Sequence, residues 1–415
     1  MITVIGLGFV GLTTALGFCE KGFKVYGLDI NKEKKNELKN FKVPFYEPGL
    51  PDALKRHLNV NFFIVDEFKE AIKQSEIIFY CVGTPCKEDG SADLKYLLNS
   101  IESSLHVMED SFKVLVIKST VPPATTSEEV KPFIEKRGFI VGRNIGLANN
   151  PEFLREGYAW EDFLFPDRVI IGAEDEKTAE ILKEAYKQFN ARLHVVSYNT
   201  SEFIKYISNA LLSTMISYAN EMSMIAHAIG DIDISQSFKI LHEDKRWSGS
   251  PAKMTSYVYP GCGFGGYCLP KDAMAMFRQS KLKGYDACIL NSVITTNGRI
   301  KDFVVQQIIK NISKEETIGI LGLSFKPNSD DVRDAPSKTI IEKLIENGFD
   351  KIIAYDPMAN NSFASTYGLN ISYADSLDEM VEHADCLILL TAWDEFRKNK
   401  EKLESKKLFD FRYFL

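Results

Sequence analysis

Length, composition and charge narrow the classes of protein to which this chain can belong. Its 415 residues exceed the roughly 250–300 that a single hydrophobic core usually serves, so two or three domains are expected. Hydrophobic residues make up 45% and charged residues 26%, and no apolar run reaches the ~18 residues that a membrane span needs. A net charge of −7 offers no basic field, which argues against nucleic-acid binding.

The N-terminus and the cysteines indicate where the protein works. The first residues, MITVIGLGFVG, lack the basic region and the small-residue cleavage site of a signal peptide. The seven cysteines lack paired metal-binding spacings and stand at positions 19, 81, 86, 262, 268, 288 and 386. Scattered thiols in odd number are typical of reduced cytosolic proteins. The sequence therefore predicts a cytoplasmic protein, and because its six histidines form no metal-like pair, no metal is expected.

The chain opens with a strand, a glycine turn, a helix and a second strand. ITVIG precedes the turn LGFVG, a helical pattern follows, and FKVYGLD has the pattern of the second strand. Later apolar runs end in polar or proline-containing turns and alternate with helical segments; they are SEIIFYCVGTP, KVLVIKSTVPP and RNIGLANNPEF. This alternation predicts a parallel, doubly wound α/β sheet.

Two further segments complete the predicted architecture. From Glu202 to Ile229, apolar residues recur at helical spacing without proline, which predicts one long helix that must be buried. It should pack on both neighbouring domains or on a second subunit, and we favour a homodimer through this segment. After about Arg299, TIGILGLSF, SKTIIEKLIENGF and DKIIAYDP repeat the order of the opening domain. The predicted fold class is thus α/β, with two Rossmann-like doubly wound domains joined by a long central helix. The expected domain boundaries are 1–198, 199–300 and 301–415.

The turn after the first strand carries a dinucleotide-binding fingerprint. Gly6, Gly8 and Gly11 form GxGxxG at the start of a helix, where they allow a tight turn, close approach of a pyrophosphate and close helix–strand packing. Asp29 ends the second strand, where a carboxylate can accept hydrogen bonds from both ribose hydroxyls of NAD and repel the 2′-phosphate of NADP. Thr84, in the later turn VGTP, could also contact the cofactor. The alternative is a glycine turn that binds another nucleotide or none.

The segment GCGFGGYCLPKD, from Gly261 to Asp272, holds the candidate nucleophile. Glycines let backbone approach a ligand closely, and a thiol beside a cation such as Lys271 can be partly ionised. Cys268 is therefore expected to attack an aldehyde. Cys262 is the competitor, but no charged pair follows it, so we assign it a structural role. The alternative for Cys268 is an ordinary buried thiol in a glycine-rich bend.

At this segment the sequence resembles the UDP-glucose/GDP-mannose dehydrogenase family, whose motif has the form GxGxGGxCxxKD. The resemblance covers nearly the whole chain in order. Further matching segments are GLGFVGL at 6–12, YEPGL at 46–50, VGTPCKEDGSADL at 82–94, STVPP at 119–123, NPEFLREG at 150–157, PDR at 166–168, EFIKYISNALLS at 202–213 and SFKPNSDDVRDAPS at 324–337. Membership implies an N-terminal NAD-binding domain, a central dimerisation and catalytic-cysteine region, and a C-terminal domain that binds a UDP-sugar.

The resemblance also implies a four-electron oxidation. Family members oxidise the sugar C6 alcohol with two NAD+ in succession, first to an aldehyde and then, as a cysteine thiohemiacetal, to a thioester that water hydrolyses. A covalent thiol adduct suits the second step because it turns the electrophilic aldehyde into a tetrahedral alkoxide able to expel hydride. By this resemblance Cys268 carries the adduct, and with UDP-glucose the product is UDP-glucuronate.

Two residues of the long helix match the family's oxyanion-binding pair. Lys205 and Asn209 lie one helical turn apart, so the resemblance implies that both face the reacting oxygen and stabilise the alkoxide. Lys205 could also take part in proton transfer, directly or through a water held with Asp272. Without the resemblance, the pair would read as a solvated helix edge.

The motif NPEFLREG supplies two carboxylates. Glu152 and Glu156 are four residues apart and would face one site if this stretch were helical. By the resemblance, Glu152 orients or deprotonates the hydrolytic water, Glu156 lies near substrate or cofactor, and Thr120 holds a water. Phe153 and Leu154 are expected along the substrate. The alternative is a pair of helix N-terminal carboxylates favoured by the helix dipole.

Four more positions match family binding residues. Lys326 matches a lysine that contacts the substrate, and Arg333 matches an arginine near the cofactor; both could bind phosphate or ribose. Gly265 is expected to place backbone against the substrate. Arg246 resembles an arginine that reaches the substrate of the neighbouring subunit, although the segment from Arg246 to Cys268 looks longer than in the family.

Substrate and activity each retain alternatives. The segments NPEFLREGYAWEDF and PDR, and CLPKD in place of a CxPxDP form, resemble the UDP-glucose branch of the family. UDP-N-acetylmannosamine and GDP-mannose are the competing substrates. A nucleotide-sugar sensor that keeps the fold without catalysis is the alternative of a different class, against which the joint presence of Cys268, Lys205, Asn209, Asp272 and Glu152 argues.

Overall fold

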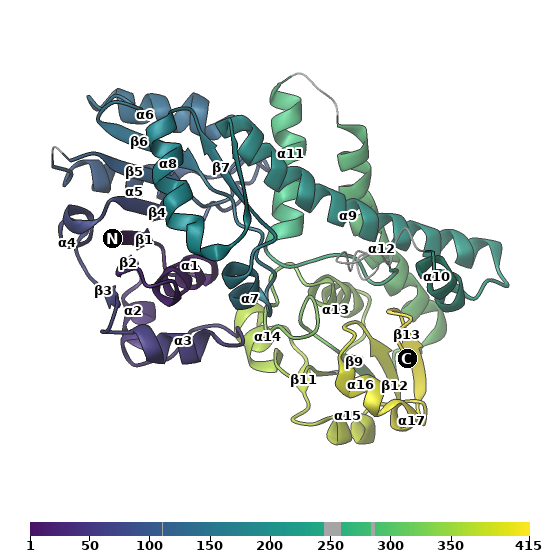
Figure 1. The fold of residues 1–415 in the computed structure, drawn as a ribbon. Coiled ribbons are helices and arrows are strands. Elements are labelled where there is room, and N and C mark those ends of the chain that lie inside the picture. The colour runs from purple at the N-terminus through teal and green to yellow at the C-terminus, as the bar shows by residue number, and fades with distance from the viewer. Residues whose placement is uncertain (110, 245–258, 284–286) are drawn as a thin grey trace. The chain divides into compact units, whose positions relative to one another are not determined.

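The chain forms two compact units, Met1–Ser208 and Asn209–Leu415. The computed structural model describes residues 1–109, 111–244, 259–283 and 287–415. Each unit is an α/β domain with its own sheet (Figure 1). Within the described part of the chain, no helix is long and apolar enough to cross a membrane.

The first unit is built on an eight-stranded sheet in the order β3-β2-β1-β4-β5-β6-β7-β8. All neighbouring pairs are parallel except β6 and β7, which are antiparallel. The strands are β1 Ile2–Ile5, β2 Val25–Leu28, β3 Phe62–Ile64, β4 Ile77–Tyr80, β5 Lys113–Ile117, β6 Ile145–Asn149, β7 Arg168–Ala173 and β8 Arg192–Val196. The chain reverses direction across the sheet between β1 and β4, where doubly wound folds bind their ligands beyond the strand ends.

Helices cover both faces of this sheet, because its buried strands alternate their side chains between two cores. Val4 and Phe79 point into one core, while Ile5 and Tyr80 point into the other. The first core receives α1 Phe9–Glu20, α3 Leu50–His57, α7 Ala159–Leu164 and α8 Glu176–Tyr186. The second core receives α4 Phe68–Gln74, α5 Lys95–Leu105 and α6 Lys131–Glu135. The remaining helical segments are α2 Lys32–Lys39, the π-helical turn Thr126–Val130 and the 3-10 turn Lys187–Phe189.

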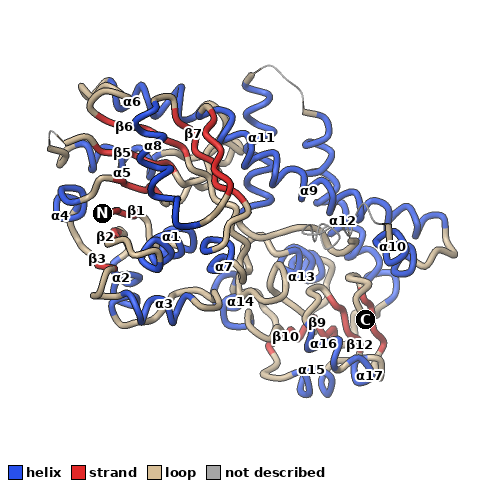
Figure 2. The backbone as a smooth tube through the Cα atoms, in the orientation of Figure 1, coloured by secondary structure: helices blue, strands red, loops and turns tan. Residues whose placement is uncertain are grey.

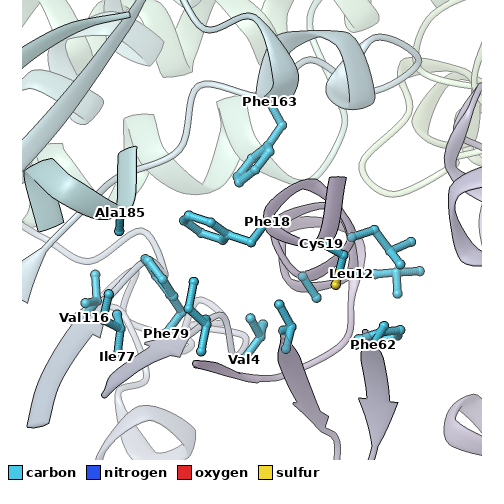
Figure 3. Packing of buried hydrophobic residues seen from close by; sticks show 14 of the residues in the cluster. Val4, Leu12, Phe18, Cys19, Phe62, Ile77, Phe79, Val116, Phe163 and Ala185 are labelled. Atoms are coloured by element: carbon cyan, nitrogen blue, oxygen red, sulfur yellow. The ribbon is translucent and has the colours of Figure 1, made fainter. Parts of the chain in front are cut away.

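An aromatic cluster fixes helix α1 against the sheet. The fully buried Phe18 ring lies 5.2 Å from the Phe79 ring and 5.6 Å from the Phe163 ring, centroid to centroid (Figure 3). Gly17 lets Phe163 approach, since a Cβ there would lie 2.1 Å from that ring. Because α1 carries the glycine turn at its N-terminus, this packing also sets the position of the turn.

The long helix is α9, Tyr198–Ile229, of 32 residues. It begins four residues earlier than the sequence suggested and crosses the boundary between the two units. Among the side chains of this helix that the structure describes, four large apolar ones are exposed in the single chain, namely Phe203, Ile207, Leu211 and Tyr218. The second unit continues with α10 Ile234–His242, α11 Cys268–Leu282 and α12 Cys288–Asn311 (Figure 2). The three-part division at 1–198, 199–300 and 301–415 stays a prediction.

The second sheet has five parallel strands in the order β11-β10-β9-β12-β13. Its strands are β9 Ile318–Leu321, β10 Ile352–Tyr355, β11 Ser372–Tyr373, β12 Cys386–Leu389 and β13 Lys407–Asp410. Its helices are α13 Pro336–Glu346, α14 Asn360–Tyr367, α15 Leu377–His383, α16 Asp394–Lys398 and α17 Lys400–Leu403. The two Rossmann-like domains expected from the sequence are therefore present.

The turn after the central strand differs between the two sheets. Gly322 follows β9 with φ +94°, as Gly6 follows β1 with φ +88°. In both turns the backbone therefore adopts the left-handed conformation that glycine tolerates. In the first unit α1 begins three residues after Gly6, whereas α13 begins only at Pro336. A loop at 323–335 thus replaces the tight dinucleotide turn in the second unit.

Asp356 occupies the position after β10 that Asp29 occupies after β2. Its buried carboxylate accepts hydrogen bonds from the Ser324 hydroxyl, the Trp393 indole and four backbone N–H groups, those of Leu323, Ser324, Met358 and Ala359. A carboxylate whose oxygens are already occupied in this way has no capacity left for ribose hydroxyls. The acidic residue has become a structural centre of the second domain.

Replacing Asp356 by Asn should therefore destabilise the second domain. The amide places N–H donors against groups that are themselves donors, which should cost about 3 kcal/mol or more. Thermal unfolding followed by circular dichroism measures this, with Asp394→Asn, an exposed carboxylate of the same domain, as the control. Equal melting temperatures for the two variants would contradict this role of Asp356.

Candidate active site

The glycine turn after β1 has the geometry that a dinucleotide needs. Gly6 adopts φ +88°, and a Cβ on Gly11 would lie 1.7 Å from the Gly6 carbonyl oxygen, so helix and strand touch there. A Cβ on Gly8 would meet no described atom within 4 Å, which leaves open space above the backbone N–H groups at the start of α1. This is the space and the positive potential that a pyrophosphate requires.

Asp29 lies directly beyond β2, beside that turn. Its carboxylate accepts hydrogen bonds from the Leu7 N–H at 2.8 Å and from the Asn31 N–H at 2.8 Å. The Lys34 ammonium forms an ion pair with it at 2.9 Å. Asp29 therefore fixes the glycine turn to β2 and keeps a lysine close by.

Thr84 and Thr120 join the turns that follow β4 and β5. The buried Thr84 hydroxyl donates a hydrogen bond to the Thr120 carbonyl oxygen at 2.8 Å. Ser119 strengthens the same junction, because its hydroxyl donates to the Val82 carbonyl oxygen at 2.6 Å. Both predicted threonines thus lie at the carboxyl edge of the sheet, next to the strand that carries the glycine turn.

Glu152 and Lys205 form a buried ion pair at 3.0 Å, with side chains only 7% and 6% exposed. The other oxygen of Glu152 accepts a hydrogen bond from the Leu154 N–H at 2.7 Å. Burial acts to raise the pKa of Glu152, but the attraction of Lys205, the Leu154 N–H and Lys118 outweighs burial and holds the pKa below its usual value. The group is therefore held as a carboxylate. Phe153 lies beneath the Lys205 ammonium, 5.5 Å from ring centroid to nitrogen.

The segment 150–157 is not a helix, so the expectation of two carboxylates on one helix face is wrong. It is an extended loop followed by a turn, and α7 begins only at Ala159. Its backbone N–H groups bond to side chains: Leu154 to Glu152, and Gly157 to the buried Glu47 at 2.8 Å. Glu156 accordingly lies in the turn and not one helical turn from Glu152. The alternative of a helix N-terminal pair fails for the same reason.

Lys118 is a buried cation that the sequence analysis did not single out. It follows β5 directly, and its ammonium donates a hydrogen bond to the Asn150 carboxamide oxygen at 3.0 Å. The Glu152 carboxylate attracts this ammonium electrostatically. The available indication was a lysine at the end of an otherwise apolar strand, VLVIK, immediately before the matched motif STVPP.

In the second unit, the glycine segment 261–267 packs against the loop that replaces the dinucleotide turn. A Cβ on Gly265 would lie 2.4 Å from the Asp334 carbonyl oxygen, and one on Gly266 would lie 2.8 Å from the Phe325 ring. The Gly266 N–H donates to the Arg333 carbonyl oxygen at 2.9 Å. These glycines therefore permit close contact between two protein segments, which the sequence analysis had attributed to a ligand alone.

The two cysteines of this segment differ in burial. Cys262 is fully buried in the core of the second domain, and burial raises the pKa of its thiol to about 12. Cys268 is exposed and is the first residue of α11, a helix of 15 residues. Only the second of these thiols is accessible to a ligand, and its place at a helix N-terminus favours the thiolate.

Asp272 links two residues, Lys271 of its own helix α11 and Asn209 of α9. It is 1% exposed, and its carboxylate accepts hydrogen bonds from the Lys271 ammonium and from the Asn209 side-chain amide. Burial acts to lower the pKa of Lys271, but the attraction of Asp272 outweighs burial and raises it. Lys271 is thus a permanent cation whose charge Asp272 balances, and Asp272 orients Asn209.

Lys326 and Arg333 both belong to the 323–335 loop. The Lys326 ammonium lies 5.5 Å from the Phe325 ring centroid. The Arg333 guanidinium forms an ion pair with Asp331 at 2.6 Å and lies 4.7 Å from the ring centroid of Tyr267, the neighbour of Cys268. Arg246 lies outside the described residues.

Arg412, near the C-terminus, is a second residue that the sequence analysis missed. Its guanidinium would be 2.1 Å from a Cβ on Gly261, so it lies against the start of the glycine segment. Nothing in the local sequence, LFDFRYFL, signals this contact, because the partners are about 150 positions apart. Among the described residues, no three His, Cys, Asp or Glu side chains are grouped as metal ligands.

Comparison with known proteins identifies the family to which this chain belongs. Three family models match in order: the NAD-binding domain of the UDP-glucose/GDP-mannose dehydrogenase family at residues 1–190, its central domain at 199–299 and its UDP-binding domain at 319–415. The chain belongs to the UDP-glucose/GDP-mannose dehydrogenase family. It is therefore an NAD-dependent UDP-sugar dehydrogenase, and the glycine turn and Asp29 lie within the part of the chain that matches the family's NAD-binding domain.

Individual members of the family resemble the chain along nearly their full length. A UDP-glucose 6-dehydrogenase from Pseudomonas aeruginosa is 37% identical over 96% of this chain and 88% of its own. The structure of a UDP-glucose dehydrogenase from Pyrobaculum islandicum has a TM-score of 0.92 at 34% identity, covering 100% of this chain and 94% of its own. That of a UDP-D-ManNAc dehydrogenase from Pyrococcus horikoshii has a TM-score of 0.86 at 28% identity, covering 100% and 96%.

The ion pair of Asp29 with Lys34 makes cofactor preference testable. We expect NAD+ to be strongly preferred over NADP+, because a 2′-phosphate would be buried against a carboxylate. Asp29→Ala should weaken NAD+ use and free the Lys34 ammonium for the 2′-phosphate, so the ratio of kcat/KM values should narrow by about tenfold or more, ~1.4 kcal/mol.

The double variant Asp29→Ala/Lys34→Met is the control. Its kcat/KM with NADP+ should fall below that of Asp29→Ala, while its kcat/KM with NAD+ should stay as low as in Asp29→Ala. Wild-type protein that uses both cofactors equally would refute the assigned role of Asp29.

Proposed function

We propose that the chain oxidises the C6 alcohol of UDP-glucose to the carboxylate of UDP-glucuronate, with Cys268 as the nucleophile of the second oxidation. One observation carries this proposal. Of the two cysteines in the glycine segment, Cys268 is exposed at the first position of α11, whereas Cys262 is buried in the core. The segment is packed against the 323–335 loop of the family's UDP-binding domain, so a bound UDP-sugar and the thiol share one rigid support.

The proposed reaction balances over two oxidations. NAD, when bound, accepts one hydride in each oxidation, so two molecules are consumed per sugar. In the first, the hydroxyl oxygen loses a proton and C6 loses a hydride, which gives an aldehyde. The Cys268 thiolate then adds to the aldehyde carbon, and the resulting thiohemiacetal loses the second hydride to give a thioester. Water cleaves the thioester, which releases the carboxylate and regenerates the thiol.

Lys205 and Asn209 would stabilise the oxygen at C6 as it gains negative charge in each oxidation. They lie four residues apart on α9, and hydrogen-bond donors aimed at a developing oxyanion are among the strongest catalytic contributions. Asp272 accepts a hydrogen bond from the Asn209 side-chain amide and so fixes the orientation of that amide. Lys205 and Asp272 would also hold the water through which the proton leaves.

Glu152 would act on the hydrolytic water, with Thr120 as a second contact of that water. The ion pair with Lys205 supports orientation of the water over full deprotonation, because a carboxylate with a lowered pKa is a weak base. Phe153, Leu154, Gly265 and Lys326 are proposed to line the sugar and the nucleotide. Glu156 and Arg333 are proposed to contact the cofactor, and Arg246 remains a prediction for the substrate.

UDP-glucose is favoured among the family's substrates by its named relatives. Curated relatives called UDP-glucose 6-dehydrogenase are 31–37% identical to the chain, while structures of UDP-N-acetylmannosamine dehydrogenases are 25–28% identical. The second group also spans nearly the whole chain, so UDP-N-acetylmannosamine is the second candidate. A protein that binds UDP-sugars without oxidising them would release no NADH with any of these substrates.

The first test is stoichiometric. Wild-type protein should release two NADH per UDP-glucose and use UDP-N-acetylmannosamine and GDP-mannose much less efficiently, as measured by absorbance. Cys268→Ala should fold and bind both ligands but lose turnover by several orders of magnitude, because the covalent route is gone. Cys262→Ala is the matched control and should keep turnover, at some cost in stability.

The covalent assignment would be wrong if Cys268→Ala still made two NADH per sugar within about tenfold of the wild-type rate, a loss of only ~1.4 kcal/mol. Faster turnover of UDP-N-acetylmannosamine than of UDP-glucose would move the substrate assignment to the second candidate.

We also propose that the chain forms a homodimer through α9. Phe203, Ile207, Leu211 and Tyr218 leave an apolar stripe exposed on this helix, and such faces are normally covered. Leu211→Glu should convert dimer to monomer at micromolar concentration in light scattering. Val60→Glu, an exposed apolar position of the first unit, should leave the mass unchanged. A wild-type protein that is monomeric would contradict the proposal.

A cytoplasmic location stays a prediction.

A further inference from the structure

Lys118 is a buried ammonium that the proposed chemistry does not use. It follows β5, is 4% exposed, and donates a hydrogen bond to the Asn150 carboxamide oxygen at 3.0 Å. Asn150 is itself held on both sides, by the Tyr186 hydroxyl at 2.5 Å and by the Ile170 carbonyl oxygen at 2.7 Å. Lys118 therefore contacts a rigid point that lies two residues before Glu152.

The titratable groups that face Lys118 come from four elements. Glu152, from the loop after β6, attracts the ammonium, and Lys205, from α9, repels it. Cys81 follows β4, and Tyr186 of α8 shares the Asn150 oxygen with Lys118. Because Glu152 already pairs with Lys205, one carboxylate attracts two cations, which leaves a net positive charge in the group.

A buried cation is costly, so its partners indicate its use. Burial lowers the pKa of Lys118 to about 8. Lys113, at the other end of β5, is equally buried, but its ammonium donates to the backbone carbonyl oxygens of Ser75 at 2.7 Å and Lys73 at 3.3 Å. Lys113 thus satisfies local backbone groups. The bond of Lys118 instead goes to the segment that carries the proposed water-binding carboxylate.

We propose that Lys118 is a positioning residue that fixes the segment 150–152 beside Lys205 through its bond to Asn150 and adds to the attraction of Lys205 that keeps Glu152 ionised. The proposal rests on the proposed function for the role of Glu152, but the coupling itself is a property of the folded chain. Through this coupling, Lys118 sets the lower end of the pH range in which Glu152 can orient water.

The sign of the expected effect follows from the charges. Removing a cation raises the pKa of each neighbouring group, so Glu152 without Lys118 would take up a proton at higher pH. Activity that needs the Glu152 carboxylate falls as pH falls through its pKa. The acid limb of the kcat profile should therefore move to higher pH when the charge at position 118 is removed.

The variants Lys118→Gln and Lys118→Met remove the charge, and the first retains a donor for Asn150. Each should move the acid limb to higher pH by at most about one pH unit, the lower end of the effect that one nearby cation exerts on a carboxylate, because Lys205 remains as the stronger attraction. The loss should appear in kcat more than in KM. Lys118→Arg should keep the acid limb of the wild type. Lys113→Met, a matched buried control at the other end of β5, should lower stability without moving the limb.

A second measurement needs no activity. In protein labelled at the lysine ε-carbon, NMR follows the titration of Lys118, assigned by its loss in Lys118→Arg. Glu152→Gln removes the attracting anion and should lower the Lys118 midpoint by about one pH unit. An unchanged midpoint, or neutral variants at position 118 with the wild-type acid limb, would overturn the proposal. Failure of the proposed function would show separately, as wild-type protein that releases no NADH with any UDP-sugar.

Discussion

The ion pair between Glu152 and Lys205 is the interaction on which the site of the first unit depends. It joins an irregular loop to a 32-residue helix, and both side chains are almost fully withdrawn from water. Breaking such a pair leaves a buried charge uncompensated, which typically costs about 3–5 kcal/mol. The loop has little other regular structure, so its course depends on this pair and on the carboxylate of Glu47, which accepts the Gly157 N–H. Contacts of two buried carboxylates thus position a segment that has no regular secondary structure of its own.

The two Rossmann-like domains show how one architecture serves two ligands. In the first, a short turn and Asp29 leave space and hydrogen-bonding capacity for a dinucleotide. In the second, the turn is lengthened to a loop at 323–335, and Asp356 is consumed by the domain's own donors. The loop then becomes the surface against which the glycine segment of Cys268 packs. One change in loop length thus removes the tight turn typical of dinucleotide sites and gives the glycine segment its packing surface.

Local pattern sufficed to predict the parts of the molecule that local physics determines. GxGxxG, the alternation of strands and helices, and the long helix all depend on neighbours in the sequence, and each was predicted within a few residues. The sequence left open whether the segment 150–157 is helical, and its loop conformation could not be predicted because its hydrogen-bond partner Glu47 lies more than 100 positions away. The partners of Gly265 and the contacts of Lys118 and Arg412 are likewise distant in sequence. Roles of individual site residues came from family resemblance, since no spacing rule reports which carboxylate meets which lysine.

The most direct test of the covalent account is to trap the intermediate. If Glu152 acts on the hydrolytic water, Glu152→Gln should slow thioester cleavage more than either oxidation, so the acyl enzyme should accumulate. After UDP-glucose and NAD+ are added and the reaction is quenched in acid, mass spectrometry should find the UDP-glucuronyl mass on the peptide that contains Cys268. The adduct should be absent from Glu152→Gln/Cys268→Ala. Accumulation of free aldehyde with no adduct, or an adduct on another cysteine, would contradict the account.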